Sequence, residues 1–267
     1  PIFTHVKLEM GNDRNNSTGA ESATMRTKGE KANVLRNPGW QLAADAKKIN
    51  PDLKVSILRW RTPAWVKKDE DRYIWYKQSI LAAYEKYGYM VDYINPNVNE
   101  AWSGAGDVKY TKKFAKWIAA ESTATIKDEK ALELFRKIKL VVSDEANVVS
   151  DSVAETMKSD QEFMDAVDVV GYHYKTADDN NGGMKWLAEV VDKEVWNSEE
   201  QATFSNTAFR PATTDKAPTV AGTGIGGSGS ALEMGNTVIK SFVESRRGHV
   251  IYQPAIGAYY EGAQYSF

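Results

Sequence analysis

The chain has no cysteine, only three histidines and no apolar run long enough to cross a membrane. The missing cysteine excludes disulfides, thiolate catalysis and zinc sites built from thiolates. His5, His173 and His249 are spread along the sequence, so we expect no metal site. The apolar runs have the length of strands, and we therefore expect no transmembrane segment.

A strong excess of charge of one sign is also missing. The 34 basic and 36 acidic residues give a net charge of −2 and no basic segment, so nothing argues for a nucleic-acid partner. Hydrophobic residues make up 42% of the chain and charged residues 26%, which predicts a packed core. The length of 267 residues suits one large domain, and we expect a single domain over residues 1–267.

Short apolar runs alternate with stretches of helical periodicity. This alternation predicts βαβ units and a parallel sheet. The run Leu140-Val141-Val142 is apolar throughout, as expected where both faces of a sheet are covered. The predicted strands are residues 4–9, 54–59, 90–95, 138–143, 167–172, 193–197 and 249–257; the predicted helices are residues 39–49, 72–87, 110–121, 148–158, 185–190 and 231–246.

Two folds share this alternation, a closed (β/α)8 barrel and an open doubly wound sheet. No glycine-rich phosphate loop follows a predicted strand, and the glycine-rich residues 222–229 follow a polar loop instead. Polar or aromatic residues follow the predicted strands, at the positions that line the active site of a barrel. We therefore predict the α/β class and a (β/α)8 TIM barrel, of which seven strands are visible here.

Two carboxylates each follow a predicted strand. Glu100 comes directly after Asn99, and Glu199 closes the segment Trp196-Asn197-Ser198-Glu199. Hydrolysis of a glycosidic bond needs two such acids, one to protonate the leaving oxygen and one to stabilise or attack the sugar carbon. Taken alone, each acid is more often a solvated loop carboxylate than a catalytic one, and Glu200 is the rival to Glu199.

Aromatic residues are numerous, with eight tryptophans and thirteen tyrosines. An aromatic ring can cover the apolar C–H face of a pyranose, so sugar stacking is one interpretation of rings near strand ends. Ordinary packing in the core and at its rim is the other. The rings concerned are Trp60, Trp65, Trp102, Tyr172, Tyr174 and Tyr260.

At these same residues the chain resembles glycoside hydrolase family 59, the galactocerebrosidase family. The similarity runs over nearly the whole chain, with modest motifs in the right order. The segments that carry it are Val6-Lys7-Leu8-Glu9-Met10-Gly11-Asn12-Asp13, Leu58-Arg59-Trp60-Arg61-Thr62-Pro63-Ala64-Trp65, Val169-Val170-Gly171-Tyr172-His173-Tyr174, Trp196-Asn197-Ser198-Glu199-Glu200 and Gln253-Pro254-Ala255-Ile256-Gly257-Ala258-Tyr259-Tyr260. These segments resemble the second, third, sixth, seventh and eighth strands of the family's barrel.

The resemblance implies that strands two to eight are present, that the first strand lies upstream of Pro1, and that the accessory β-domains are absent. It assigns Glu100 as the acid/base after strand four and Glu199 as the nucleophile after strand seven. It implies a carbohydrate or glycolipid substrate, no cofactor, and an extracellular or lysosomal-like location. The substrate-binding residues that it implies are Asn99 at the sugar 2-hydroxyl, and Ser17, Trp60, His173 and Tyr260.

The chain departs from the family in two places. After Glu199 it reads Glu200-Gln201-Ala202, where the family offers an acid, an aromatic residue and a serine, and Gln253 stands where a tryptophan is expected. The predicted function is a retaining β-glycosidase that removes a terminal β-galactosyl residue from a glycolipid-like or other aglycone. Two alternatives remain open: a related barrel β-glycosidase with another sugar specificity, and an inactive barrel that binds carbohydrate.

Overall fold

The computed structural model describes residues 3–16, 19–173, 182–200, 235, 238–243, 246 and 248–252. The chain divides into two compact units. The first unit comprises Pro1–Arg14, Ala20–Val142 and Glu162–Asp168, and the second comprises Asn15–Gly19, Ser143–Gln161 and Val169–Phe267.

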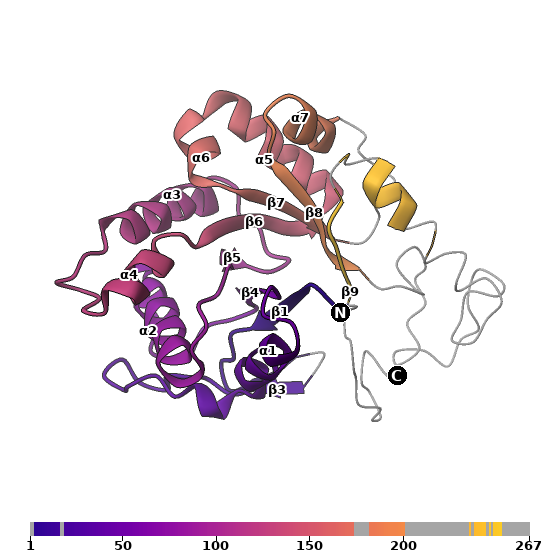
Figure 1. Cartoon of the computed structure of the whole chain (residues 1–267). Coiled ribbons are helices and arrows are strands. Elements are labelled where there is room, and N and C mark those ends of the chain that lie inside the picture. The colour runs from indigo at the N-terminus through magenta and orange to yellow at the C-terminus, as the bar shows by residue number, and fades with distance from the viewer. Residues whose placement is uncertain are drawn as a thin grey trace. The chain divides into compact units, whose positions relative to one another are not determined.

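Strands and helices alternate along the chain (Figure 1). The strands are β1 (His5–Glu9), β2 (Arg14–Asn16), β3 (Gly19–Glu21), β4 (Lys54–Arg59), β5 (Tyr93–Val98), β6 (Lys139–Ala146), β7 (Val169–His173), β8 (Glu194–Glu200) and β9 (Val250–Tyr252). The helices are η1 (Val34–Arg36), α1 (Pro38–Ile49), α2 (Asp69–Tyr87), α3 (Ala105–Ala120), α4 (Glu129–Phe135), α5 (Asn147–Ser159), α6 (Gln161–Ala166) and α7 (Gly183–Glu189).

Strand pairing is parallel in both units. In the first unit β1 pairs with β4, β4 with β5, and β5 with β6. In the second unit β7 pairs with β8, and β8 with β9. Parallel neighbours joined by helices are the βαβ units that the predicted α/β barrel requires.

Helix α1 ends where it is predicted to end and begins one residue before its predicted start. The Asn37 side chain accepts a hydrogen bond from the backbone N–H of Gly39 at 2.9 Å, and Pro38 fills the first helical position. Trp40, Ala43 and Ala44 form the buried face. The helix ends at Ile49 and is followed by Asn50, whose N–H donates to the Ala46 carbonyl.

The core of the first unit lies between its strands and its helices. Ile57 of β4 and Ile94 of β5 belong to one cluster with the large rings Trp40, Trp75 and Phe114. The strand residues that alternate with these point to the other face of the sheet and make a second, more polar layer. There His5 Nε2 lies 2.9 Å from Ser56 Oγ, and its ring stacks on Tyr93 with centroids 5.7 Å apart.

Strand β5 differs from its prediction, because it runs over Tyr93–Val98 rather than residues 90–95. Proline lacks the N–H that a ladder needs, so the sequence predicts an end before Pro96. The register instead shifts: Ile57 pairs with Ile94 and Arg59 with Val98, so β5 carries two residues more than β4 over this span. This irregularity accommodates Pro96, whose carbonyl accepts from Arg59 Nε at 3.2 Å.

The other predicted strands and helices are present with boundaries shifted by a few residues, as far as the structure describes them. Strand β6 extends to Ala146. The short elements β2, β3, η1, α4 and α6 are not predicted. Of the predicted helix over 231–246, residues 238–243 are described and helical, and residues 253–257 of the last predicted strand lie outside the described residues.

In the second unit α5 and α7 lie side by side over β7 and β8 (Figure 1). The backbone N–H of Gly183 donates to Asp151 Oδ1 at 3.1 Å and ties the start of α7 to α5. A side chain at Gly183 would overlap Asp151, so the close approach of the two helices depends on this glycine.

A buried ion pair joins α2 to the end of α3 in the first unit. Lys77 Nζ lies 2.5 Å from Glu121 Oε2, and the Tyr73 hydroxyl donates to Glu121 Oε1 at 2.6 Å. Burial alone would raise the pKa of the Glu121 carboxyl, but hydrogen bonds from Lys77, Thr125 and Tyr73 outweigh burial and leave this pKa below its usual value.

We predict that Glu121→Ala lowers the free energy of unfolding by about 3 kcal/mol, because Lys77 then stays buried without its anion. Urea unfolding monitored by circular dichroism measures this change. Asp52→Asn, at an exposed loop position, is the matched control and should change the free energy by less than about 0.5 kcal/mol.

The folded pKa of Glu121 lies below the unfolded value of 4.5, so its contribution to the free energy of unfolding is complete above pH 4.5 and is lost as the pH falls through the folded pKa. An equal difference between parent and variant at neutral pH and in strong acid would contradict this account.

Candidate active site

The carboxyl end of β8 carries an irregularity that sets the direction of Glu199. Tyr172 of β7 pairs with Asn197 of β8, whereas the next residue, His173, pairs with Glu199. Ser198 is therefore an extra residue on β8, in the manner of a β-bulge. Bulges at the rim of a barrel re-aim side chains, and this one brings Glu199 opposite His173.

His173 lies between two carboxylates. Its Nε2 is 3.5 Å from Asp144 Oδ1 and its Nδ1 is 3.6 Å from Glu199 Oε2. His173 and Asp144 have no exposed surface, and Glu199 is 6% exposed. Acids and imidazole ligate metals in other proteins, but glycoside hydrolysis by a carboxylate pair requires none.

Asp144 comes from the end of β6 and closes this cluster. The Ser198 hydroxyl donates to Asp144 Oδ1 over 2.5 Å, which joins the end of β8 directly to the end of β6. A Cβ at Gly171 would overlap both the Ser198 hydroxyl and the Asp144 carboxylate, so the sheet needs a glycine there. Sequence analysis did not single out Asp144 for a role. Its only signal is the Ser143-Asp144-Glu145 segment after a predicted strand.

Glu200, the rival of Glu199, is held in a different way. It is fully buried, and its Oε2 accepts from Asn197 Nδ2 at 2.7 Å. Asn197 Nδ2 also lies 3.2 Å from the Ser241 hydroxyl. The bond to Asn197 gives Glu200 a structural partner on its own strand, which favours Glu199 as the reactive acid.

In the first unit Asn99 and Glu100 form the turn that follows β5. The backbone N–H of Asn99 donates to the Arg59 carbonyl at 2.9 Å, and the Asn99 side chain is buried. Glu100 has a φ of 53°, in the left-handed region, and its side chain is exposed. Trp60 follows β4 and is half-buried. These residues thus lie at the carboxyl ends of their strands, as a barrel active site requires.

Three of the aromatic residues near strand ends pack within the protein. Trp65 Nε1 donates to the Met25 carbonyl at 2.9 Å, the Trp102 ring lies 6.3 Å from that of Phe163, and Tyr172 is fully buried. Packing is therefore the better interpretation for these three rings. Ser17, Tyr174 and Tyr260 lie outside the described residues.

Two acids near the end of β1 differ in their environment. A hydrogen bond from the Arg26 guanidinium lowers the pKa of Asp13, whose Oδ1 also accepts from the Ala23 N–H at 3.2 Å. Burial raises the pKa of Glu21. Asp13 thus has a local structural role, and Glu21 is a partly buried acid at the end of β3.

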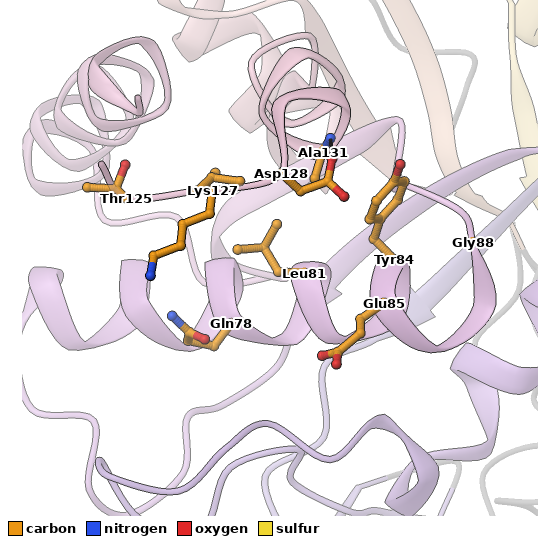
Figure 2. Close-up of a pocket in the computed structure, with 10 residues that line it drawn as sticks. Gln78, Leu81, Tyr84, Glu85, Gly88, Thr125, Lys127, Asp128 and Ala131 are labelled. Carbon is orange, nitrogen blue, oxygen red and sulfur yellow. Dashed lines mark hydrogen bonds between the residues drawn. The ribbon is translucent and has the colours of Figure 1, made fainter. Parts of the chain in front are cut away.

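A groove of about 620 Å³ lies beside α2 in the first unit (Figure 2). Its walls come from α2 and from the segment between α3 and α4. Leu81 and Tyr84 face Lys127 and Asp128 across it. The candidate site residues do not line this groove.

Across the residues that the structure describes, no helix combines the length and the apolar character needed to cross a bilayer.

Several curated proteins are similar to this chain. Galactocerebrosidase from Salmo salar is 27% identical over 212 residues, and the proteins of the same name from Mus musculus and Homo sapiens are each 26% identical. Each match covers 75% of this chain and 27% or 28% of the relative. The chain therefore spans little more than a quarter of the length of the curated relatives it matches.

Solved structures agree on the fold. The crystal structure of SrfJ from Salmonella typhimurium matches with a TM-score of 0.66 at 16% identity, and the match covers 98% of this chain and 59% of that one. An endo-β1,6-glucanase matches with a TM-score of 0.55 at 14% identity, over 74% of this chain and 48% of that one. The predicted α/β barrel is confirmed by the parallel βαβ order and by these matches.

The model of glycosyl hydrolase family 59 matches residues 1–267. The family resemblance drawn from the sequence motifs is thereby confirmed over the whole chain. This protein belongs to glycosyl hydrolase family 59.

Proposed function

We propose that this chain is the catalytic domain of a retaining β-glycosidase that removes a terminal β-galactosyl residue from a glycolipid-like or other aglycone. The observation that carries the proposal is the placement of Glu199, at the bulged end of β8 beside His173, in a member of family 59. The names of the curated relatives support galactose as the sugar.

The proposed reaction has two displacements at the anomeric carbon. In the first, a Glu199 carboxylate oxygen forms a bond to that carbon while the glycosidic C–O bond breaks. The electron pair of the broken bond goes to the leaving oxygen, which takes the proton of Glu100. In the second, Glu100 removes a proton from water, the water oxygen bonds to the anomeric carbon, and Glu199 leaves as a carboxylate.

The two acids need opposite protonation states at the start. Glu199 must be ionised to attack, and Glu100 must hold a proton to give to the leaving oxygen. A carboxylate raises the pKa of an acid close to it, so the mechanism requires the charge of Glu199 to favour the protonated form of Glu100. A retaining mechanism further requires the two carboxyl groups about 5–5.5 Å apart.

Five residues are proposed to bind the sugar. Asn99 would hold the 2-hydroxyl, and Trp60 would stack on the pyranose face. Ser17, His173 and Tyr260 are the other proposed contacts. The buried, anchored position of Asn99 suits a fixed hydrogen-bonding group.

The wider setting of this domain is also proposed. Residues 1–267 are proposed to form a single catalytic domain. A secreted or lysosomal-like location follows from the same resemblance. The reaction needs no cofactor, because both displacements use carboxylates and water alone.

We expect Glu199→Ala to lower kcat for a nitrophenyl β-galactoside by at least about 1,000-fold, because the first displacement loses its nucleophile. Release of nitrophenol, followed by absorbance, measures the effect. Glu189→Gln is the control: this exposed acid of the second unit pairs with Arg246 and should leave kcat unchanged. Sugar binding by the parent chain without any turnover would instead favour the inactive carbohydrate-binding barrel.

Glu100→Gln should lower kcat/KM by a factor that depends on the leaving group of the substrate. An unactivated galactoside needs a proton on its leaving oxygen, so its kcat/KM should fall by about 100-fold or more. A dinitrophenyl galactoside leaves without protonation, and its kcat/KM should fall by less than about 10-fold. Steady-state kinetics on both substrates separates these cases, and full turnover of the unactivated galactoside would refute the acid role.

A further inference from the structure

In the second unit, Glu199 is surrounded by more buried polar side chains than the proposed reaction itself uses. Asp144, His173, Ser198 and Glu199 come from the ends of β6, β7 and β8, and all four are buried. We propose that Asp144 is a positioning residue for Glu199, which it fixes through the His173 imidazole and the Ser198 hydroxyl. This inference rests on the proposed function, in which Glu199 is the nucleophile.

The first link is the imidazole. Nε2 faces Asp144 at 3.5 Å and Nδ1 faces Glu199 at 3.6 Å, so the ring spans the two carboxylates. An ionised carboxylate can only accept hydrogen bonds, so each one needs a hydrogen on the nitrogen that faces it. At these ion-pair separations, a ring with a proton on both nitrogens carries the positive charge that attracts Asp144 and Glu199 together. Asp144 thereby supplies the charge that keeps this form of the ring stable beside the nucleophile.

The second link runs through the bulge. Ser198 is the extra residue of β8 and directly precedes Glu199. Its hydroxyl lies 2.5 Å from Asp144 Oδ1 and 3.2 Å from the Tyr172 carbonyl. Its single hydrogen goes to the charged and closer Asp144. This bond fixes the bulge, and the bulge determines where the Glu199 side chain points.

Asp144 is itself held in a strained conformation. Ser143 and Asp144 have φ values of 72° and 50°, in the left-handed region that non-glycine residues seldom adopt. Such a conformation is unfavourable for a non-glycine residue and persists only where its surroundings hold it. Here the Ser143 hydroxyl lies 3.1 Å from the Ser150 hydroxyl of α5, which in turn donates to the Gly171 carbonyl at 3.0 Å. Backbone strain of this kind is typical of residues whose side-chain orientation serves a function.

Asp144→Asn tests the proposal, because it removes the charge and keeps the shape. We expect kcat/KM for a dinitrophenyl β-galactoside to fall by about 10- to 100-fold, with little change in the inhibition constant of a galactose-like competitive inhibitor. This substrate needs no acid, so the loss reports on the nucleophile. Asp151→Asn is the matched control: it is a buried acid of the same unit, bonded to the Gly183 N–H, and it should lower stability without changing kcat/KM.

A second measurement does not depend on turnover. The chain has three histidines, so long-range 1H–15N spectra resolve each ring, and His5→Gln and His249→Gln assign them. We expect Asp144→Asn to move the ring nitrogens of His173 from the protonated toward the neutral pattern, while Asp151→Asn leaves them in place. Ser198→Ala, which keeps the Asp144 carboxylate, should lower kcat/KM by a smaller factor than Asp144→Asn.

Two results would overturn the proposal: a His173 spectrum that does not change in Asp144→Asn, or a kcat/KM within about threefold of the parent value in this variant. If the parent chain turns over no galactoside, the proposed function fails, and the spectrum alone then decides whether Asp144 fixes the ring.

Discussion

The register of β8 against β7 is the constraint on which the candidate site depends. Side chains of a strand alternate between two faces, so one extra residue reverses the direction of everything after it. Ser198 is that residue, and it lets Glu199 pair with His173 one position after Asn197 pairs with Tyr172. A regular ladder would instead set Ser198 opposite His173. The position of the proposed nucleophile thus depends on pairing geometry as much as on its place in the sequence.

A similar irregularity occurs in the first unit. Strand β5 gains two residues relative to β4 around Pro96, and the ladder resumes where Val98 pairs with Arg59 and the Asn99 N–H donates to the Arg59 carbonyl. The turn of Asn99 and Glu100 follows directly. Both acids of the proposed mechanism therefore stand immediately after, or within, a break in regular pairing. Such breaks are frequent at barrel rims, because they turn side chains to a different face from the one that a regular strand would give them.

Sequence patterns are sufficient to predict the alternation of strands and helices, since periodicity and apolar runs depend on neighbouring residues. They are also sufficient to place Glu100 and Trp60 directly after strands and Glu199 at the carboxyl end of one, although β8 extends through Glu200 and so includes Glu199. Sequence patterns fail at β5. The predicted strand ends at residue 95, before Pro96, whereas pairing with β4 extends the observed strand to Val98. They also miss Asp144, because its proposed positioning role depends on residues of three strands that meet only in the folded chain. The short α4 and α6 were missed because a helix of one or two turns carries little periodicity.

Covalent trapping tests the central claim most directly. A 2-deoxy-2-fluoro-β-galactosyl fluoride forms the glycosyl-enzyme faster than water releases it, so the nucleophile stays labelled. Proteolysis and tandem mass spectrometry then locate the sugar. Our account predicts an ester on Glu199. A label on Glu200, or hydrolysis of a galactoside with inversion at the anomeric carbon and no covalent adduct, would contradict it.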